Sequence, residues 1–260
     1  MNIKFGPAGL GSIRDAEETL EEYGKLGLKV CEIAFTYRVY IKKEKDAKRI
    51  RKVAKKFGIK LTIHAPYWVN LNSEDWEKVE ASKKRVLDSC KVGHWLGAER
   101  VVFHCGYFEK KDKEGTYENI KNRIKEMLEE VKKNKWKIKL APETMGKVNV
   151  FGSVEEISRL VKDTGCSFCL DFAHILARDK KIEWREIKKL FPQKNWHVHF
   201  SGIEYGEKGE KHHRKTRKKE WKHLLENLPR NKNITIINEA PNPVQDSFEG
   251  LRVWEKLRKA

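Results

Sequence analysis

The chain has 260 residues, of which 39% are hydrophobic and 36% charged, and its formal net charge is +18. It contains no run of about 20 apolar residues and no apolar segment near its N-terminus, so we expect no membrane partner and no secretory signal. The five cysteines are scattered, which argues against a disulfide framework and predicts a reducing, cytoplasmic location.

Apolar runs of strand length alternate along the chain with charged segments that have helical periodicity. The predicted strands cover residues 2–5, 29–35, 59–64, 100–104, 137–143, 167–171, 196–200 and 234–239. The predicted helices cover residues 13–26, 44–57, 74–96, 116–134, 153–164, 182–190, 216–227 and 246–258. Ser12, Ser73 and Ser153 precede three of these helices, and serine is a preferred N-cap residue.

Eight predicted strands that alternate with eight predicted helices favour an α/β fold, the (β/α)8 TIM barrel, whose typical length is roughly 250 residues. No linker or low-complexity tract divides the sequence, so we expect a single domain over residues 1–260. A doubly wound open sheet is the alternative. Its usual glycine-rich phosphate turn has only a weak counterpart here, GPAGLG at residues 6–11.

Several predicted strands end on residue types that bind metals, and a TIM barrel has its active site at the C-terminal ends of its strands. Each strand from the third to the eighth brings a histidine or an acid to that end. These residues are His64, His104, Glu143, Asp171 with His174 close behind it, His199 and Glu239. Any one of them alone would more simply be a hydrogen-bonded structural residue or a helix cap.

The combination is harder to explain without a metal. Carboxylates that meet in a half-buried mouth repel one another, imidazoles there lose their hydration, and a divalent cation relieves both costs. The mixed nitrogen and oxygen donors predict two or three Zn²⁺ ions, with Mn²⁺ as an alternative. His197 lies two residues before His199 on the same strand face, so we expect it one layer deeper.

Residues 202–223 follow the seventh predicted strand and are predicted to form a basic loop that leads into a helix. This loop adds Glu210, His212 and His213 to the same rim, and two adjacent histidines beside an acid can complete a metal site. An ordinary solvated loop is the plainer interpretation. The position of the segment on the expected active rim favours a functional role.

The positive charge favours a polyanionic partner, because each neutralised phosphate releases counterions. Lys211 and Arg214, within the basic loop, are candidates to hold phosphates. A heavily charged surface of the kind found in heat-adapted proteins would give the same composition.

The ordered motifs IHAPYWVN, VFHCG, APETMG, LDFAH, HVHFSG, EKHH and NEAPN resemble the endonuclease IV family of apurinic/apyrimidinic endonucleases, which belongs to the xylose isomerase-like barrel superfamily. The resemblance runs from about residue 60 to residue 243. It implies a zinc-dependent phosphodiester hydrolase of base excision repair, which cleaves double-stranded DNA 5′ to an abasic site. Such an enzyme would be intracellular and associated with the nucleoid.

By this resemblance the metal ligands are His64, His104, Glu143, Asp171, His174, His199, Glu210, His212 and Glu239. Glu143 would bridge two metals and act as the catalytic carboxylate. Glu210 stands where the family has aspartate, and His213 is an alternative to His212. Tyr67 matches a residue that enters the DNA at the damaged nucleotide, and Arg38, after the second strand, corresponds to an inserted arginine.

Two other functions fit the same sequence. A sugar isomerase or epimerase of the same superfamily would need only Glu143, Asp171, His199 and Glu239 around one metal, often manganese. It would have no use for the remaining histidines. A basic nucleic-acid-binding protein with a structural metal site would bind DNA without cleaving it. We expect the protein to be a monomer.

Overall fold

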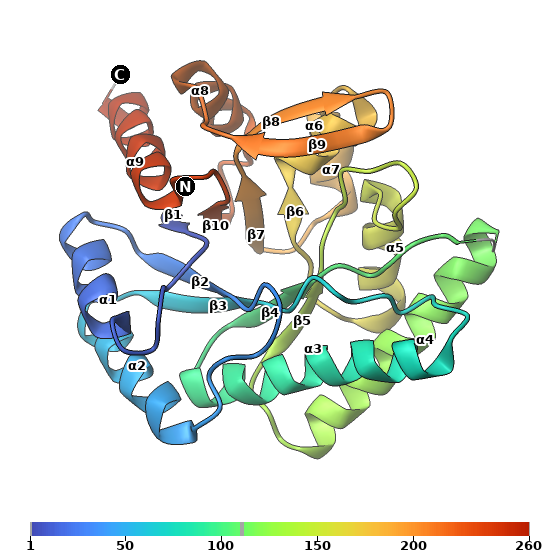
Figure 1. Ribbon diagram of the computed structural model, residues 1–260. Coiled ribbons are helices and arrows are strands. Elements are labelled where there is room, and N and C mark those ends of the chain that lie inside the picture. Colours follow the sequence, from blue (N-terminus) through green and yellow to red (C-terminus); the bar gives the residue numbers. More distant parts are fainter. Residues whose placement is uncertain (1, 110–111, 260) are drawn as a thin grey trace.

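The computed structural model describes residues 2–109 and 112–259, and eight parallel strands within these ranges form a barrel surrounded by helices (Figure 1). The barrel strands are β1 (Asn2–Pro7), β2 (Val30–Ala34), β3 (Lys60–His64), β4 (Arg100–Phe103), β5 (Lys139–Pro142), β6 (Leu170–Asp171), β7 (Asn195–Phe200) and β10 (Asn233–Asn238). They pair in the orders β1-β10-β7-β6 and β2-β3-β4-β5. Isolated parallel bridges, Ala8 to Glu32 and Glu143 to Cys169, join the two halves and close the barrel.

Helices cover the outside of the barrel and alternate with its strands, as the sequence predicts (Figure 1). They are α1 (Ala16–Lys25), α2 (Glu44–Lys56), α3 (Trp76–Leu96), α4 (Lys113–Lys133), α5 (Val154–Thr164), α6 (Phe172–Asp179), α7 (Trp184–Leu190), α8 (Lys218–Asn227) and α9 (Pro243–Lys259). Ser153 caps α5 in a capping box with Glu156. The cap of α3 is Asp75 rather than Ser73, and its carboxylate accepts two backbone N–H groups.

Side chains alternate between the two faces of each strand, so the barrel has an outer and an inner layer. The outer layer packs under the helices and forms the main hydrophobic core, which includes Ile33, Ile63, Val101, Leu140, Val198 and Ile236. A separate small cluster of Val102, Ala141 and Cys169 lies on the inner face. Beside it, Glu32 of β2 meets His197 of β7 across the barrel. The interior is therefore partly polar directly below the mouth.

Two elements depart from the predicted secondary structure. Residues 202–214, predicted as loop, form an antiparallel hairpin of β8 (Gly202–Gly206) and β9 (Gly209–Arg214), which lies beside α6 (Figure 1). The helix α6, which the sequence did not predict, follows β6 without a loop. Apolar runs predict strands, and this hairpin has none because most of its residues are exposed or half-buried.

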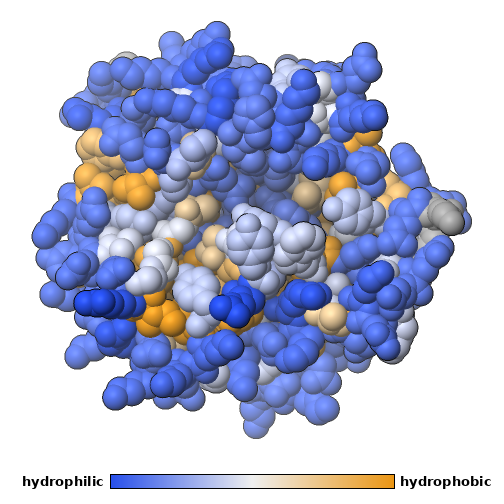
Figure 2. Space-filling model, in the orientation of Figure 1, coloured by the Kyte–Doolittle hydropathy of each residue, from blue (hydrophilic) through white to orange (hydrophobic). Residues whose placement is uncertain are grey.

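Hydrophilic side chains cover most of the face drawn in Figure 2, and white to orange residues gather across its middle.

All five cysteines are buried and free, as their scattered spacing predicts. Across residues 2–109 and 112–259, no helix combines the length and apolar character that crossing a bilayer requires.

Candidate metal centre

Glu143 follows β5 and lies at the centre of the converging side chains. It is fully buried, and its Oε2 atom lies 3.2 Å from His64 Nε2 and 3.1 Å from His104 Nε2. Its Oε1 atom faces the opposite way, 2.8 Å from His199 Nδ1. One carboxylate therefore touches imidazoles from three strands, since parallel strands bring their C-terminal ends to one rim.

Four groups of ligand-type side chains have their ligand atoms within 4.8 Å of one another, and three of these groups lie at the mouth, while the fourth, Cys169, His197 and His199, lies deeper. The first group is His64, His104 and Glu143. The second is Glu143, Asp171, His199 and Glu239, and the third is Asp171, His174 and His213. Glu143 and Asp171 each belong to two groups, so two carboxylates connect the three sets.

The hairpin brings Glu210 to the third group. Glu210 Oε2 lies 3.5 Å from His174 Nε2, and its Oε1 lies 3.7 Å from His213 Nε2. Glu210 also touches the loop after β5, because its backbone N–H donates to the carbonyl of Gly146 at 3.0 Å. A methyl group added at Gly146 would lie 2.8 Å from Glu210 Cβ, so the hairpin packs closely against the rim.

His213, rather than His212, faces the cluster, which reverses the order of preference predicted for these two histidines. In a regular strand Glu210 and His212 would share a face. However, β9 pairs His212 with Glu204 and Glu210 with Tyr205, so Lys211 is an extra residue between two consecutive paired positions. This extra residue is a β-bulge, which shifts the alternation by one position and turns His213 inward. His212 is exposed.

Three of the histidines are held in the same orientation by neutral oxygens. His64 Nδ1 lies 2.7 Å from the Ala65 carbonyl, and His174 Nδ1 lies 3.0 Å from that of Thr144. His213 Nδ1 lies 2.5 Å from Ser201 Oγ, which itself donates to a backbone carbonyl. Each Nδ1 therefore donates to its oxygen, which makes Nε2 the nitrogen that could offer a lone pair to a cation in the cluster.

Several buried atoms of the cluster that could bind a metal have no hydrogen-bond partner among the described residues. They are Glu143 Oε1, Asp171 Oδ2 and His199 Nδ1. Orphaned buried polar atoms are costly, and these are of the two kinds, carboxylate oxygen and imidazole nitrogen, that zinc and manganese accept as ligands. The residues present therefore fit one or more divalent cations.

The charged groups of the cluster strongly shift one another's pKa values. Burial alone would raise the pKa of Glu143, but the surrounding rings of His199, His104 and His64 hold it well below its ordinary value. Burial would lower the pKa of His174, but Asp171 and Glu143 raise it to about 9. Burial raises the pKa of Asp171 in spite of His174. Without a cation, protons on the imidazoles must balance the carboxylates.

The mouth opens into a cavity of about 660 Å³, lined by ligand-type residues and by the loops after β1, β2 and β3. Tyr67 stands in its wall, 44% exposed, and its ring stacks on His104 with centroids 5.5 Å apart. Trp68, next in the chain, is 65% exposed. An aromatic surface thus borders the ligand groups on one side.

The predicted DNA-contacting cations differ in their surroundings. Arg38 and Lys211 are exposed. Arg214 forms ion pairs with Glu204 and Glu220, each at 2.7 Å, so its charge is already balanced.

Glu32 is a residue of the site that sequence reasoning missed. It is fully buried on β2, and its carboxylate contacts both His197 and His199. The available signal is a single acid inside the predicted strand 29–35, flanked on both sides by apolar residues. His197 lies below His199, as the sequence predicted.

Two sequence relatives were found. The uncharacterized protein MJ0133 of Methanocaldococcus jannaschii is 35% identical over 222 residues, which cover 80% of each chain. A probable endonuclease 4 of Mycobacterium marinum is 24% identical over 145 residues, which cover 54% of each chain.

Solved structures with the same fold include an endonuclease and a sugar epimerase. Endonuclease IV from Thermus thermophilus has a TM-score of 0.68 and 21% identity, with all of both chains covered. SacUVDE has a TM-score of 0.72 and 18% identity, with 95% of this chain and 88% of that chain covered. D-psicose 3-epimerase has a TM-score of 0.69 and 17% identity, with 100% and 98% covered. The family described as xylose isomerase-like TIM barrel matches residues 20–257, and this chain belongs to it.

Proposed function

We propose that the protein is a metal-dependent phosphodiester hydrolase that cleaves double-stranded DNA 5′ to an abasic site. The observation that carries this proposal is the number of connected ligand groups. A single metal normally takes three or four protein ligands, whereas this rim presents three groups joined through Glu143 and Asp171. The comparisons support a choice between nuclease and sugar enzyme, and the surplus of ligands favours the nuclease.

The proposed ligand assignment follows the three groups. His64, His104 and Glu143 would hold one ion, and Glu143, Asp171, His199 and Glu239 a second. Asp171, His174 and His213 would hold a third, with Glu210 from the hairpin. The donor set favours Zn²⁺, with Mn²⁺ as the alternative.

Divalent cations bound there would lower the pKa of a ligand water, neutralise phosphate charge and stabilise the leaving oxygen. The contribution of the chain is to fix the donors and shape the mouth. Glu143 stays ionised at neutral pH, since its pKa is held low by the histidines around it. Burial raises the pKa of the Tyr67 hydroxyl, so this side chain remains a proton donor in the cavity wall.

Charge and aromatic surface support DNA as the substrate. The net charge of +18 favours a polyphosphate partner, and two exposed cations lie at the active rim, Arg38 on the loop after β2 and Lys211 on the hairpin strand β9. Tyr67 and Trp68 provide exposed rings beside the ligand groups, where they could stack on a base or fill the gap left by a missing one.

The second candidate is a sugar isomerase or epimerase with one metal. The specific observation in its favour is that Glu143, Asp171, His199 and Glu239 form a complete four-residue group on their own. The cavity of about 660 Å³ also has room for a small sugar. This function leaves His64, His104, His174 and His213 without a role.

One experiment separates the two functions. The purified protein is loaded with Zn²⁺ or Mn²⁺, its metal content per chain is measured, and it is incubated with a duplex that contains one abasic site and, separately, with ketoses. We expect two or three ions per chain and a chelator-sensitive cut 5′ to the abasic site. One ion per chain with epimerisation of a ketose, and an intact duplex, would establish the sugar enzyme instead.

A further inference from the structure

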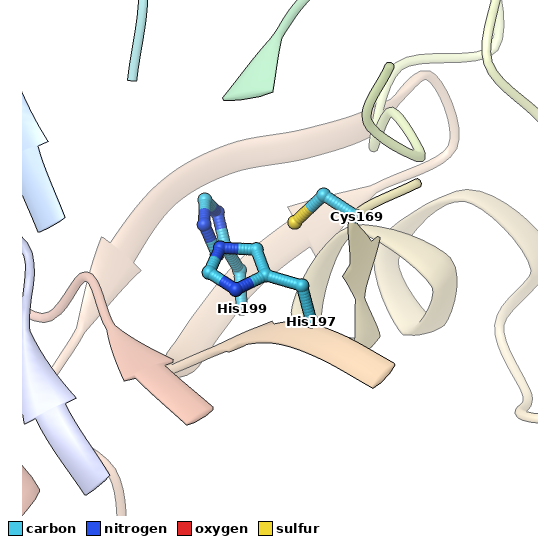
Figure 3. A group of neighbouring side chains, drawn as sticks. All are labelled: Cys169, His197 and His199. Atoms are coloured by element: carbon cyan, nitrogen blue, oxygen red, sulfur yellow. The ribbon is translucent and has the colours of Figure 1, made fainter. Parts of the chain in front are cut away.

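Glu32 lies inside the barrel, below the ligand groups at the mouth, and it belongs to none of the four groups of ligand-type side chains. It sits on β2, and the two histidines that it contacts sit on β7, across the barrel interior. Figure 3 shows His197 and His199 with Cys169 beside them, all projecting from their strands into the same space. All four side chains are fully buried.

Each oxygen of Glu32 has its own neighbours. Oε2 accepts hydrogen bonds from Thr62 Oγ1 at 2.8 Å and from His197 Nε2 at 3.0 Å. Oε1 lies 2.9 Å from His199 Nε2. This last contact is close without being aligned as a hydrogen bond, and Oε1 has no other hydrogen-bond partner within the described residues. Oε1 is therefore available to His199 alone.

His199 is oriented in the opposite sense to the other histidines of the cluster. His64, His174 and His213 present Nε2 to the centre and give Nδ1 to a neutral oxygen. His199 instead presents Nδ1, which lies 2.8 Å from Glu143 and 3.4 Å from Glu239. Among the described residues no backbone carbonyl holds its Nε2, and the oxygen that it faces belongs to Glu32.

A carboxylate in this place has a defined effect on the ring. It attracts the proton to Nε2, which leaves the lone pair of Nδ1 directed at the ligand group. With a carboxylate at Nε2, Nδ1 is also a stronger electron donor than it would be with a neutral oxygen there, because the imidazole gains partial anionic character. Burying an isolated anion is costly, and a cation above His199 offsets that cost.

We propose that Glu32 is a positioning residue, which fixes His199 as an Nδ1 ligand of the metal group formed with Glu143, Asp171 and Glu239. The inference rests on the metal-binding part of the proposed function and does not depend on which substrate is used. It gives the four-residue group an outer partner that differs chemically from the partners of the other histidines.

The same side chains allow a competing interpretation, in which Cys169, His197 and His199 bind a metal of their own. The contacts of both histidines argue against it. His197 Nε2 is bonded to Glu32, which leaves only the buried Nδ1 of His197 open. Both nitrogens of His199 face carboxylates, Nε2 at 2.9 Å from Glu32 and Nδ1 at 2.8 Å from Glu143. Cys169 belongs to the small apolar cluster with Val102 and Ala141.

The test measures metal binding and needs no DNA. Zn²⁺ affinity is measured by competition with a chelating dye, and Co²⁺ is used as a visible probe of ligand geometry. Glu32→Gln removes the charge while keeping the size of the side chain. Thr62→Val is the matched control, because it removes a hydrogen bond from the same carboxylate and leaves the charge in place.

We expect Glu32→Gln to weaken one bound Zn²⁺ by about 10–100-fold and to change the Co²⁺ spectrum. Thr62→Val should weaken it by less than about fivefold, because the charge that faces His199 stays in place. In a His199→Gln background, Glu32→Gln should have no further effect on affinity, since the two residues act through one contact. If Glu32→Gln does not fold, Glu32→Asp keeps the charge but draws it back from His199, and the same loss is expected in lesser degree.

Unchanged Zn²⁺ affinities in a folded Glu32→Gln protein would overturn the proposal, even if its unfolding temperature fell. Additive effects of the Glu32 and His199 substitutions would do the same. Loss of one Zn²⁺ equivalent in Cys169→Ser would show that the deep cluster binds a metal itself. A protein that binds metals as expected but leaves abasic duplex intact would instead contradict only the proposed function.

Discussion

Strand ends carry His64, His104 and Glu143 to the mouth of the barrel, whereas a hairpin carries Glu210 and His213 over it. The strand-borne donors are fixed by the parallel register of neighbouring strands, for example Ala34 beside His64. The hairpin-borne donors depend on one bulge and on close packing against the loop after β5. The same rim is therefore rigid on one side and assembled from a projecting element on the other.

The rigid side should be the more sensitive to substitution. Glu143→Gln removes a charge that two ligand groups share, so metal binding should fall in both. We expect the loss of DNA cleavage to exceed the range of about 10–100-fold that removal of an outer partner causes. Cleavage rate and metal content per chain are the measurements.

The control for this prediction is Glu207→Gln, which changes an exposed acid between the two hairpin strands. It should leave both metal content and cleavage unchanged. Normal metal content in Glu143→Gln would contradict the central place given to this carboxylate.

On the hairpin side, His213→Gln and His212→Gln form a matched pair of neighbours. The ligand atom of His213 lies within 4.8 Å of those of Asp171 and His174, while His212 is exposed on the opposite face. We expect His213→Gln to lose about one metal ion per chain and about 10–100-fold in cleavage rate. His212→Gln should resemble the wild type. The reverse result would mean that the bulge at Lys211 is absent in solution.

This pair of histidines also shows which part of the site the sequence does not predict. His64, His104, Glu143, Asp171 and Glu239 converge as predicted, because an apolar strand followed by a polar residue fixes which end of the barrel that residue occupies. The choice between His212 and His213 needed the register of a hairpin with no apolar alternation. A single extra residue in one strand reverses which side chains face inward, and nothing in EKHH signals it.

Glu32 was missed for a different reason. An acid inside a predicted strand has no special position along the chain, and its importance comes from His197 and His199, more than 160 residues away. Only the closure of the barrel brings β2 opposite β7. Contacts across the interior depend on strand order and stagger, which local patterns do not contain.

Metal removal should change the local stability of the two sides of the rim to different extents. The hairpin shares the third ligand group with α6, so a chelator should loosen the hairpin more than the barrel strands. We expect amide hydrogen exchange in residues 202–214 to become about tenfold faster on chelation, which corresponds to about 1.4 kcal/mol of local stability. Exchange in β3, β4 and β5 should change little. Equal acceleration in both regions would remove the distinction between a rigid and an assembled side.

The smallest expected effect concerns the hairpin cations, and it tests whether the assembled side also contacts DNA. Lys211 is exposed and sits at the bulge, whereas Arg214 is bound to Glu204 and Glu220. Lys211→Ala should therefore remove one phosphate contact. The slope of the logarithm of the DNA-binding constant against the logarithm of salt concentration should become shallower by about 0.9. Arg214→Ala should change the slope less, because its charge is already balanced within the chain.

Binding of abasic duplex is measured against salt concentration with the Glu143→Gln protein, so that cleavage does not interfere. Arg38→Ala supplies the comparison from the rigid side, since this exposed arginine follows β2. If Arg38→Ala lowers the slope and Lys211→Ala does not, DNA lies against the barrel loops and the hairpin serves only to hold metal. If both lower it, the duplex spans the mouth, and the hairpin acts at once as a source of ligands and as a wall of the binding groove.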